Sequence, residues 1–203
     1  MSNVGLLYVG AVLFVNALML LGKVDGKSAG IFNLFVGALQ VFTPIYLIVT
    51  AHGDPWLVFS ASGIFLFGFT YLYVGIANLT NISASGVGWY SLWVAILAIG
   101  YSIVNFVHFG DYKFGIIWLM WAFLWGLFYL LLAQNKDIGT FTGWVTMIEA
   151  WVTCTLPAFL SLTGLWNQIG VAAAIVGVLV FAALVAWAYS RTRSGRPLSR
   201  AMS

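Results

Sequence analysis

The sequence contains very little charge. Only 6% of its 203 residues are Asp, Glu, Lys or Arg, whereas 63% are hydrophobic. A soluble domain has about 25% charged residues, so this composition excludes a soluble protein and indicates an integral membrane protein. The formal net charge of +3 arises from so few residues that it gives no indication of nucleic-acid binding.

Cysteine and histidine are almost absent. The single cysteine, Cys154, excludes an internal disulfide and a cysteine-based metal cluster. His52 and His108 are the only histidines, and their separation is not that of a pair of metal ligands. The chain also offers no combination of nucleophile and base, so we expect no metal site, no cofactor and no enzymatic activity.

Long apolar runs fill most of the chain. Each is about 20 residues long, the length that crosses a bilayer, and short breaks such as "AHGDP" and "HFGDYK" carry turn residues. The first run has neither a basic n-region nor a cleavage site, so we expect a membrane span rather than a signal peptide. The predicted fold is all-α and integral to the membrane, a compact bundle of seven transmembrane helices at about residues 4–22, 29–50, 56–79, 87–107, 114–134, 142–164 and 168–189.

Three stretches of the first six runs resemble one another. Each reads as an aromatic-bearing helix, a short loop and a second helix, and Asp25 and Asp137 occupy similar turn positions. This weak similarity predicts three repeated two-helix hairpins around a common axis, with the seventh helix added outside the repeat. Internal repeats are common in transport proteins, whose binding sites lie at the repeat interfaces.

The basic residues predict an orientation in the membrane. If the N-terminus is extracytoplasmic, seven of the eight Lys and Arg residues are cytoplasmic and only Lys113 is outside, which agrees with the positive-inside rule. The C-terminus and a basic tail, residues 191–203, are then cytoplasmic, where the tail anchors the topology or faces lipid headgroups. The seven are Lys23, Lys27, Lys136, Arg191, Arg193, Arg196 and Arg200.

Glu149 is the only acidic residue inside a predicted span. A carboxylate at membrane depth costs about 3 kcal/mol or more, so it normally faces the bundle interior or a water-filled path. Thr146 and Thr153 lie at i−3 and i+4 and share its helix face. One interpretation is a polar contact for a permeating solute; the other is a structural acceptor for an indole N–H or a tyrosine hydroxyl.

Three tryptophans share one face of the fifth span. Trp118, Trp121 and Trp125 lie at i, i+3 and i+7, which extends about 10 Å along a helix. Trp118 suits an aromatic belt at the membrane interface, but Trp121 and Trp125 lie too deep for one. Aromatic core packing and a wall that lines a pore both remain open.

The apolar, aromatic character of this wall limits what could pass it. No ring of charges suits an ion, and a hydrated ion could not recover its desolvation cost in such a passage. A small, flat, neutral solute with both donors and acceptors fits better. Urea or a short amide could slide between aromatic faces, with its N–H groups on π faces or Glu149 and its carbonyl accepting from an indole.

With these motifs the sequence resembles the AmiS/UreI family of urea channels and short-chain amide transporters. The resemblance covers about residues 4–165 and implies a bacterial cytoplasmic (inner) membrane protein that forms a homohexamer with one pore in each protomer. It divides the chain into a six-helix channel domain (1–165), a seventh transmembrane helix (166–190) and the basic tail (191–203). The motifs are "LLYVG" at 6–10, "KVDGKS" at 23–28, "NLFVG" at 33–37, "LFGFTYLY" at 66–73, "WYSLWVAI" at 89–96, "IIWLMW" at 116–121, Trp125 and Glu149.

The resemblance also assigns residues to the pore. It implies a tryptophan ladder, an aromatic constriction in the third helix, an apolar lining in the first helix and a buried carboxylate. These are, in order, Trp118, Trp121 and Trp125; Phe67 and Tyr71; Leu6, Val9 and Leu13; and Glu149.

The family's acid-gated members carry longer, histidine-rich external loops, whereas the external loops here are short. We therefore expect a passive channel for urea and short-chain aliphatic amides without acid gating, which supplies a cytoplasmic urease or amidase. His52 and His108 are the candidates for any modulation by pH, because histidine titrates in the physiological range. The alternative is a proton-coupled transporter that uses Glu149.

Overall fold

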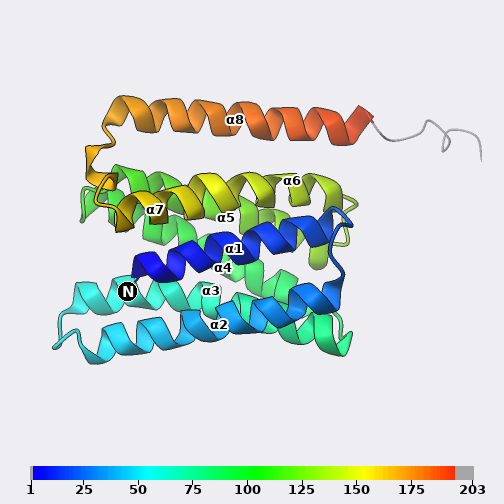
Figure 1. The fold of residues 1–203 in the computed structure, drawn as a ribbon, viewed down its shortest axis with the longest axis horizontal. Coiled ribbons are helices and arrows are strands. Elements are labelled where there is room, and N and C mark those ends of the chain that lie inside the picture. The colour runs from blue at the N-terminus through cyan, green and yellow to red at the C-terminus, as the bar shows by residue number, and fades with distance from the viewer. Residues whose placement is uncertain (1, 195–203) are drawn as a thin grey trace, which may run out of the picture.

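A computed structural model describes residues 2–194 and is helical throughout, with no strand in that range (Figure 1). Within these residues seven segments are long and apolar enough to span a membrane, which confirms the predicted fold class. The basic tail beyond residue 194, including Arg196 and Arg200, lies outside the described residues. The elements are α1 (Ser2–Leu20), α2 (Gly26–Val49), α3 (Pro55–Thr80), α4 (Ser85–Val107), α5 (Tyr112–Leu132), α6 (Gly139–Glu149), the π-helical η1 (Ala150–Thr155), α7 (Leu156–Leu162), the 3₁₀ turn η2 (Trp166–Gln168) and α8 (Val171–Ser194).

Three loop aspartates determine where helices begin. Asp25, Asp54 and Asp111 are N-caps whose carboxylates accept backbone N–H groups at 2.8 to 3.0 Å. Such caps satisfy orphan donors of the first helical turn, and each contributes about 1 kcal/mol. These three acidic residues therefore have a structural role at the ends of α2, α3 and α5.

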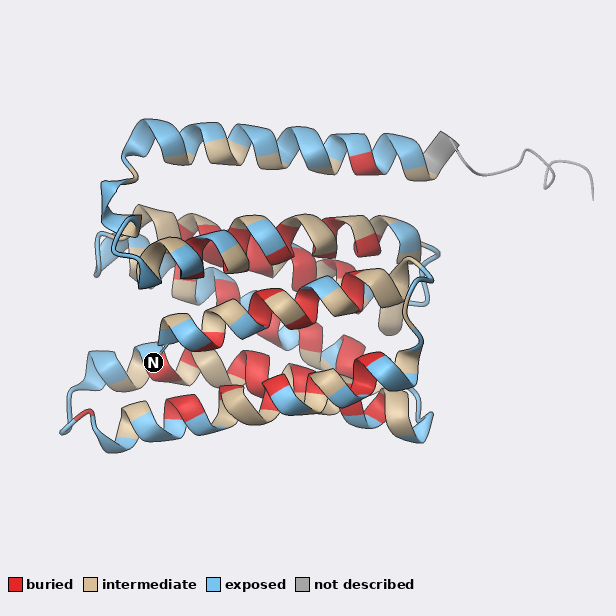
Figure 2. Cartoon of the chain, viewed as in Figure 1, coloured by how far each residue is buried: buried red, intermediate tan, exposed pale blue. Residues whose placement is uncertain are grey.

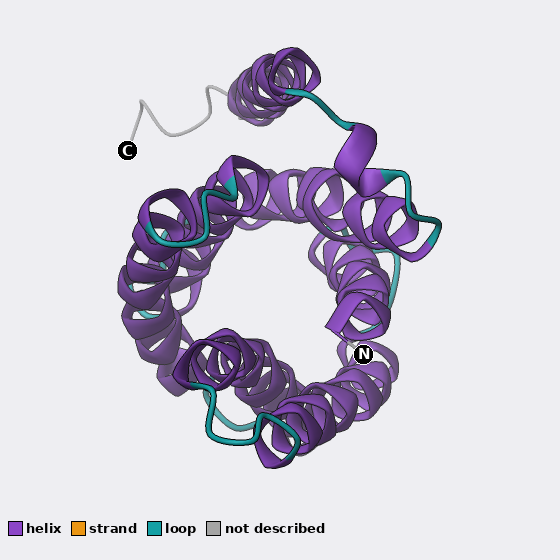
Figure 3. Ribbon diagram, turned by 90° about the vertical axis from the view of Figure 1, so that its left-hand side faces the viewer, coloured by secondary structure: helices purple, strands orange, loops and turns teal. Residues whose placement is uncertain are grey.

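The first six spans surround a common axis, and α8 lies outside this ring (Figure 3). The most extensive packing joins α2 to α3, α4 to α5, and α1 to the sixth span, which consists of α6, η1 and α7. These close pairs fall between the sequence repeats rather than within them. We call the end of the ring at which α1 begins the N-terminal face, and the end at which α1 finishes the far face.

The α2–α3 pair is held at backbone contact by glycine. A Cβ on Gly37 would lie 2.8 Å from the backbone nitrogen of Leu72, and a Cβ on Gly75 would lie 2.9 Å from the carbonyl oxygen of Gly30. Small residues allow this approach between membrane helices, where lipid gives no hydrophobic driving force for association. These glycines therefore set the distance between the two helices.

Buried residues gather on the helices of the ring, whereas α8 is mostly exposed (Figure 2). Buried residues form 28 to 44% of each of the first six spans but only 6% of the α8 span. An apolar helix with so little protein contact is suited to a lipid environment. The seventh span thus stands apart from the six-helix ring that the others form.

The sixth span is interrupted by a π-helical turn directly after Glu149. Pro157 has no backbone N–H, and its ring excludes the carbonyl one turn earlier, so a regular α-helix cannot continue through this position. The turn widens instead, and the Thr155 hydroxyl donates to the carbonyl of Ala150 at 2.7 Å. On α1, a Cβ on Gly10 would lie 3.0 Å from that same carbonyl oxygen, so the turn packs directly on a glycine. Such π-turns occur frequently at functional sites.

Candidate functional site

Aromatic side chains from α3 and α5 meet inside the ring. Phe67 lies 6.1, 4.8 and 4.8 Å, between ring centroids, from Trp118, Trp121 and Trp125. Trp118 and Trp121 also contact each other edge-to-face at 4.9 Å. The three tryptophans are only 4 to 8% exposed and belong to one buried cluster. Their shared face points into the ring, which an aromatic belt facing lipid would not do.

Two cavities lie inside the ring, one toward each face. The N-face cavity has a volume of about 430 Å³ and is lined by residues such as Ser2, Gly63 and Tyr101. The far-face cavity has a volume of about 90 Å³ and is lined by residues such as Met19, Ala77 and Leu132. Phe67 and Trp121 line both cavities, and their rings meet edge-to-face at 79°. We call this ring pair the neck, because it forms the boundary that the two cavities share.

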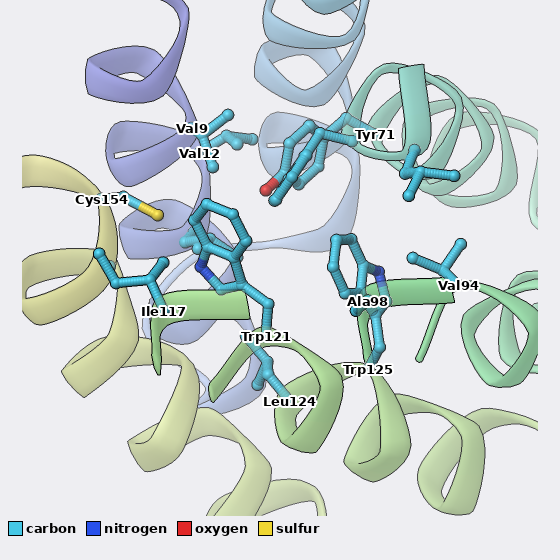
Figure 4. Close-up of a cluster of buried hydrophobic side chains, with 14 of the residues drawn as sticks. Val9, Val12, Tyr71, Val94, Ala98, Ile117, Trp121, Leu124, Trp125 and Cys154 are labelled. Carbon is cyan, nitrogen blue, oxygen red and sulfur yellow. The ribbon is translucent and has the colours of Figure 1, made fainter. Parts of the chain in front are cut away.

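Eight of the nine residues predicted to line a pathway line at least one of these cavities. Leu6, Val9 and Trp118 line the N-face cavity. Leu13, Tyr71 and Trp125 line the far-face cavity, and the two neck residues complete the set. Figure 4 shows the Tyr71 side chain pointing toward the indoles of Trp121 and Trp125. The structure therefore brings together residues from three helices that are far apart in the sequence.

The deep indole of Trp121 has a hydrogen-bond partner. Its Nε1 donates to the hydroxyl of Thr153 at 2.9 Å, and that hydroxyl donates to the main-chain carbonyl of Glu149 at 2.7 Å. An indole N–H in an apolar interior needs such an acceptor. The first turn of the π-helix therefore fixes the orientation of the ring that forms one side of the neck.

Glu149 does not line either cavity. It is fully buried, and among the described residues neither carboxyl oxygen has a hydrogen-bond partner. The sequence left open whether this carboxyl fixes an indole, but the indole of Trp121 bonds to Thr153 and reaches Glu149 only through its backbone. Direct contact with a solute stays a prediction.

Two amide pairs hold α1 against α2. Asn16 and Asn33 exchange side-chain hydrogen bonds of 3.0 and 2.6 Å, and Gln40 donates to the carbonyl of Gly5 at 2.7 Å. Buried polar side chains commonly join membrane helices in this way. Asn16 and Gln40 also line the far-face and N-face cavities, so they add polar groups to both walls.

Tyr101 is a wall residue that was not predicted from the sequence. Its ring stacks on Trp118 with 4.5 Å between centroids and 16° between planes, and it lines the N-face cavity together with Asn105. The available signal was the i, i+4 spacing of Tyr101 and Asn105, two polar-tipped residues on one face of an apolar span. The N-face cavity is thus bounded by an aromatic pair as well as by the neck.

The two histidines lie at the N-terminal face, and His108 contacts Phe109, which lines the N-face cavity. His52 is an exposed loop residue, and His108 stacks on Trp56 at the N-terminal face with 3.5 Å between centroids. Neither lines a cavity. In the part of the chain that the structure describes, no three His, Cys, Asp or Glu side chains are grouped to hold a metal ion.

Comparison with known proteins gives one consistent result. A family model described as "AmiS/UreI family transporter" matches residues 1–165. A "Putative transporter protein AmiS2" from Rhodococcus erythropolis is 52% identical over 89% of this chain and 88% of its own length. A "Putative amidate substrates transporter protein" from Mycolicibacterium smegmatis is 48% identical over 91% and 87%. The crystal structure of the urea channel from Helicobacter pylori aligns with a TM-score of 0.74 at 33% identity, covering 82% of this chain and 99% of that one.

Proposed function

This chain belongs to the AmiS/UreI family of transporters, and on that premise we propose that it is a passive, bidirectional channel for urea and short-chain aliphatic amides. The observation that carries the proposal is the pair of cavities that meet at the neck of Phe67 and Trp121. Among its relatives, one is named for amidate substrates and another is a urea channel, and these names support the two solute classes.

The neck favours flat, neutral solutes. A planar amide can move along an indole or phenyl face, where its N–H groups meet π density. Polar groups on both sides, including the Tyr71 hydroxyl and the Asn16 and Gln40 amides, offer hydrogen bonds before and after the neck. A hydrated ion would lose its water there without a compensating charge, so it is rejected.

We further propose that permeation does not require acid. The two histidines, the side chains that ordinarily gain charge between neutral and mildly acidic pH, line neither cavity. The acidic residue in the wall of the N-face cavity is Asp111, whose carboxylate accepts the backbone N–H of Phe114 as a helix cap. The aromatic neck itself does not titrate. The proposed channel therefore has no gate that opens on protonation.

Stopped-flow light scattering on proteoliposomes tests both points. We expect urea and acetamide permeability well above that of empty liposomes, and nearly equal at about pH 5 and about pH 7.5, because no histidine lines the path. Fast flux only at the lower pH would restore acid gating and direct attention to His52 and His108. Absence of flux at both pH values would contradict a passive pore.

A proton-coupled transporter is the second candidate, and one observation favours it. The carboxyl of Glu149 is buried without a hydrogen-bond partner among the described residues, as expected of a group that exchanges a proton during a cycle. Against it, Glu149 lines neither cavity. The passive channel therefore remains the better supported function.

Glu149→Gln separates the two candidates, since it keeps the side-chain volume but removes the titratable proton. For a passive channel we expect downhill acetamide flux within about twofold of wild type and no accumulation against a gradient in either protein. Uphill accumulation driven by a pH gradient in wild type, and its loss in Glu149→Gln, would establish proton coupling. Asp25→Asn, at a loop N-cap, is the matched control substitution.

Assembly and placement complete the proposal. We propose a homohexamer of independent pores in a bacterial cytoplasmic membrane, with the N-terminal face extracytoplasmic and the C-terminus cytoplasmic, as the distribution of lysine and arginine favours. Residues 1–165 would form the channel and 166–190 the added span. The permeated solute would reach a cytoplasmic urease or amidase.

A further inference from the structure

A crevice separates α8 from the six-helix ring. Its volume is about 170 Å³, and its walls come from α5, the η1–α7 segment, η2 with Ile169, and one face of α8. We call it the α8 crevice. Its lining residues on α8 are small or aliphatic: Ala173, Ala174, Gly177 and Val178.

The crevice exists because α8 packs on the ring mainly at one end. Toward the far face, Trp144 contacts Trp187 at 5.3 Å, Phe141 contacts Tyr189 at 5.7 Å, and Ala188 is fully buried. Toward the N-terminal face α8 has no comparable contact with α7, and the crevice occupies this region. Its floor is the outer side of α5, behind the tryptophan ladder.

The crevice is amphipathic along its length. On α5 it runs from Lys113 through Ile116 and Ile117 to Met120, about 10 Å from the start of the helix toward the membrane centre. Lys113 is the one charged residue of the lining, and the residues that follow it toward the membrane centre are apolar. The cationic side chain therefore lies at the mouth, at the depth of lipid headgroups, and the apolar part follows at the depth of acyl chains.

The ammonium of Lys113 is held in this position by protein contacts. Nζ donates to the carbonyl of Trp166 at 2.9 Å and lies 4.9 Å from the centre of the Trp166 ring. The adjoining hydroxyl of Tyr112 donates to the carbonyl of Ile169 at 3.2 Å, which fixes the same segment. An ammonium has three donors, so two remain beyond the bond to Trp166, and an anionic oxygen suits them.

We propose that the α8 crevice binds an anionic phospholipid, with one acyl chain between α8 and α5 and the phosphate on Lys113. A neutral ligand in the crevice would leave the ammonium of Lys113 without a counter-charge. A helix of a second copy, about 10 Å wide with its side chains, would require α8 to move away from the ring. The lipid would act as a wedge that holds α8 parallel to the ring.

Native mass spectrometry in mild detergent with added dioleoyl phosphatidylglycerol or dioleoyl phosphatidylcholine tests the proposal. Wild type is expected to retain phosphatidylglycerol in preference to phosphatidylcholine. Lys113→Gln should weaken retention of the anionic lipid about fivefold, the effect of one lysine near an anionic headgroup. Lys136→Gln, which changes a lysine at the far face, is the matched control and should leave retention unchanged.

A second pair of variants tests the apolar part. A Cβ on Gly177 meets no atom within 4 Å, so Gly177→Leu should fill the crevice without strain and reduce retention of both lipids. Gly100→Leu is the control, because Gly100 is equally unobstructed but exposed on α4. Ala174→Leu repeats the test if Gly177→Leu is poorly expressed.

Unchanged retention in both Lys113→Gln and a crevice-filling variant would overturn the proposal, as would equal retention of the two lipids by wild type. An assembly that dissociates on filling the crevice, without bound lipid in wild type, would instead show a contact between copies and would also overturn it. Urea flux should persist in all these variants, so the result is independent of the proposed function.

Discussion

Replacing Trp121 with alanine is expected to abolish discrimination between acetamide and larger solutes while leaving the protein folded. The indole is one of the two rings of the neck, and it contacts Phe67 and Trp118 at 4.8 and 4.9 Å. Its removal joins the two cavities through a gap the size of the lost ring. Longer amides and glycerol should then pass, and their permeability relative to acetamide should rise by about tenfold or more.

The measurement is stopped-flow permeability of acetamide, butyramide and glycerol in proteoliposomes. Trp93→Ala is the matched control, because Trp93 is 53% exposed on the outer surface of α4. Trp121→Phe keeps an aromatic ring but loses the N–H that bonds to Thr153, so it separates ring size from hydrogen bonding. Wild-type discrimination in a folded Trp121→Ala protein would refute the neck.

Gly37→Leu is expected to prevent folding altogether. Overpacking costs about 1–3 kcal/mol even where side chains can shift, and here the first neighbour is the backbone nitrogen of Leu72 at 2.8 Å. The helices α2 and α3 would have to separate along their whole contact. We therefore expect little or no monodisperse protein by size-exclusion chromatography in mild detergent.

Gly100→Leu introduces the same side chain where no atom lies within 4 Å, and its yield should match that of wild type. The comparison isolates helix contact from hydrophobicity and helix propensity, since both substitutions are glycine to leucine within a span. A normal yield of folded Gly37→Leu protein would mean that the α2–α3 contact is not essential.

The sequence was sufficient for the fold class and for much of the cavity wall. Low charge and apolar runs of about 20 residues predict membrane spans, and these spans must be helical because lipid offers no hydrogen bonds to an unpaired backbone. The i, i+3, i+7 spacing then places three indoles on one helix face whatever the neighbouring helices are. The pairing of α2 with α3 was not predictable from those patterns. It depends on glycines such as Gly37 and Gly75, each of which lies against the backbone of the other helix, and periodicity within one helix carries no information on its partner.

The environment of Glu149 shows a second limit of the sequence. Its burial followed from its charge, but its position outside both cavities depends on how the sixth span packs on α1. The stacking of Tyr101 on Trp118 likewise depends on the rotation of α4 about its own axis. Both features depend on tertiary packing, which the sequence pattern of a single helix does not determine.

The π-helical turn also alters how the sixth span is counted. From Val145 onward its buried residues recur every four positions: Val145 and Thr146, Glu149 and Ala150, Thr153 and Cys154, then Pro157 and Ala158. A helix of 3.6 residues per turn would fall about one residue behind over that distance. The turn absorbs one extra residue, so a helical wheel drawn through the whole span assigns the second half to the wrong side. Alignments of this span should therefore treat the halves before and after the turn as separate registers.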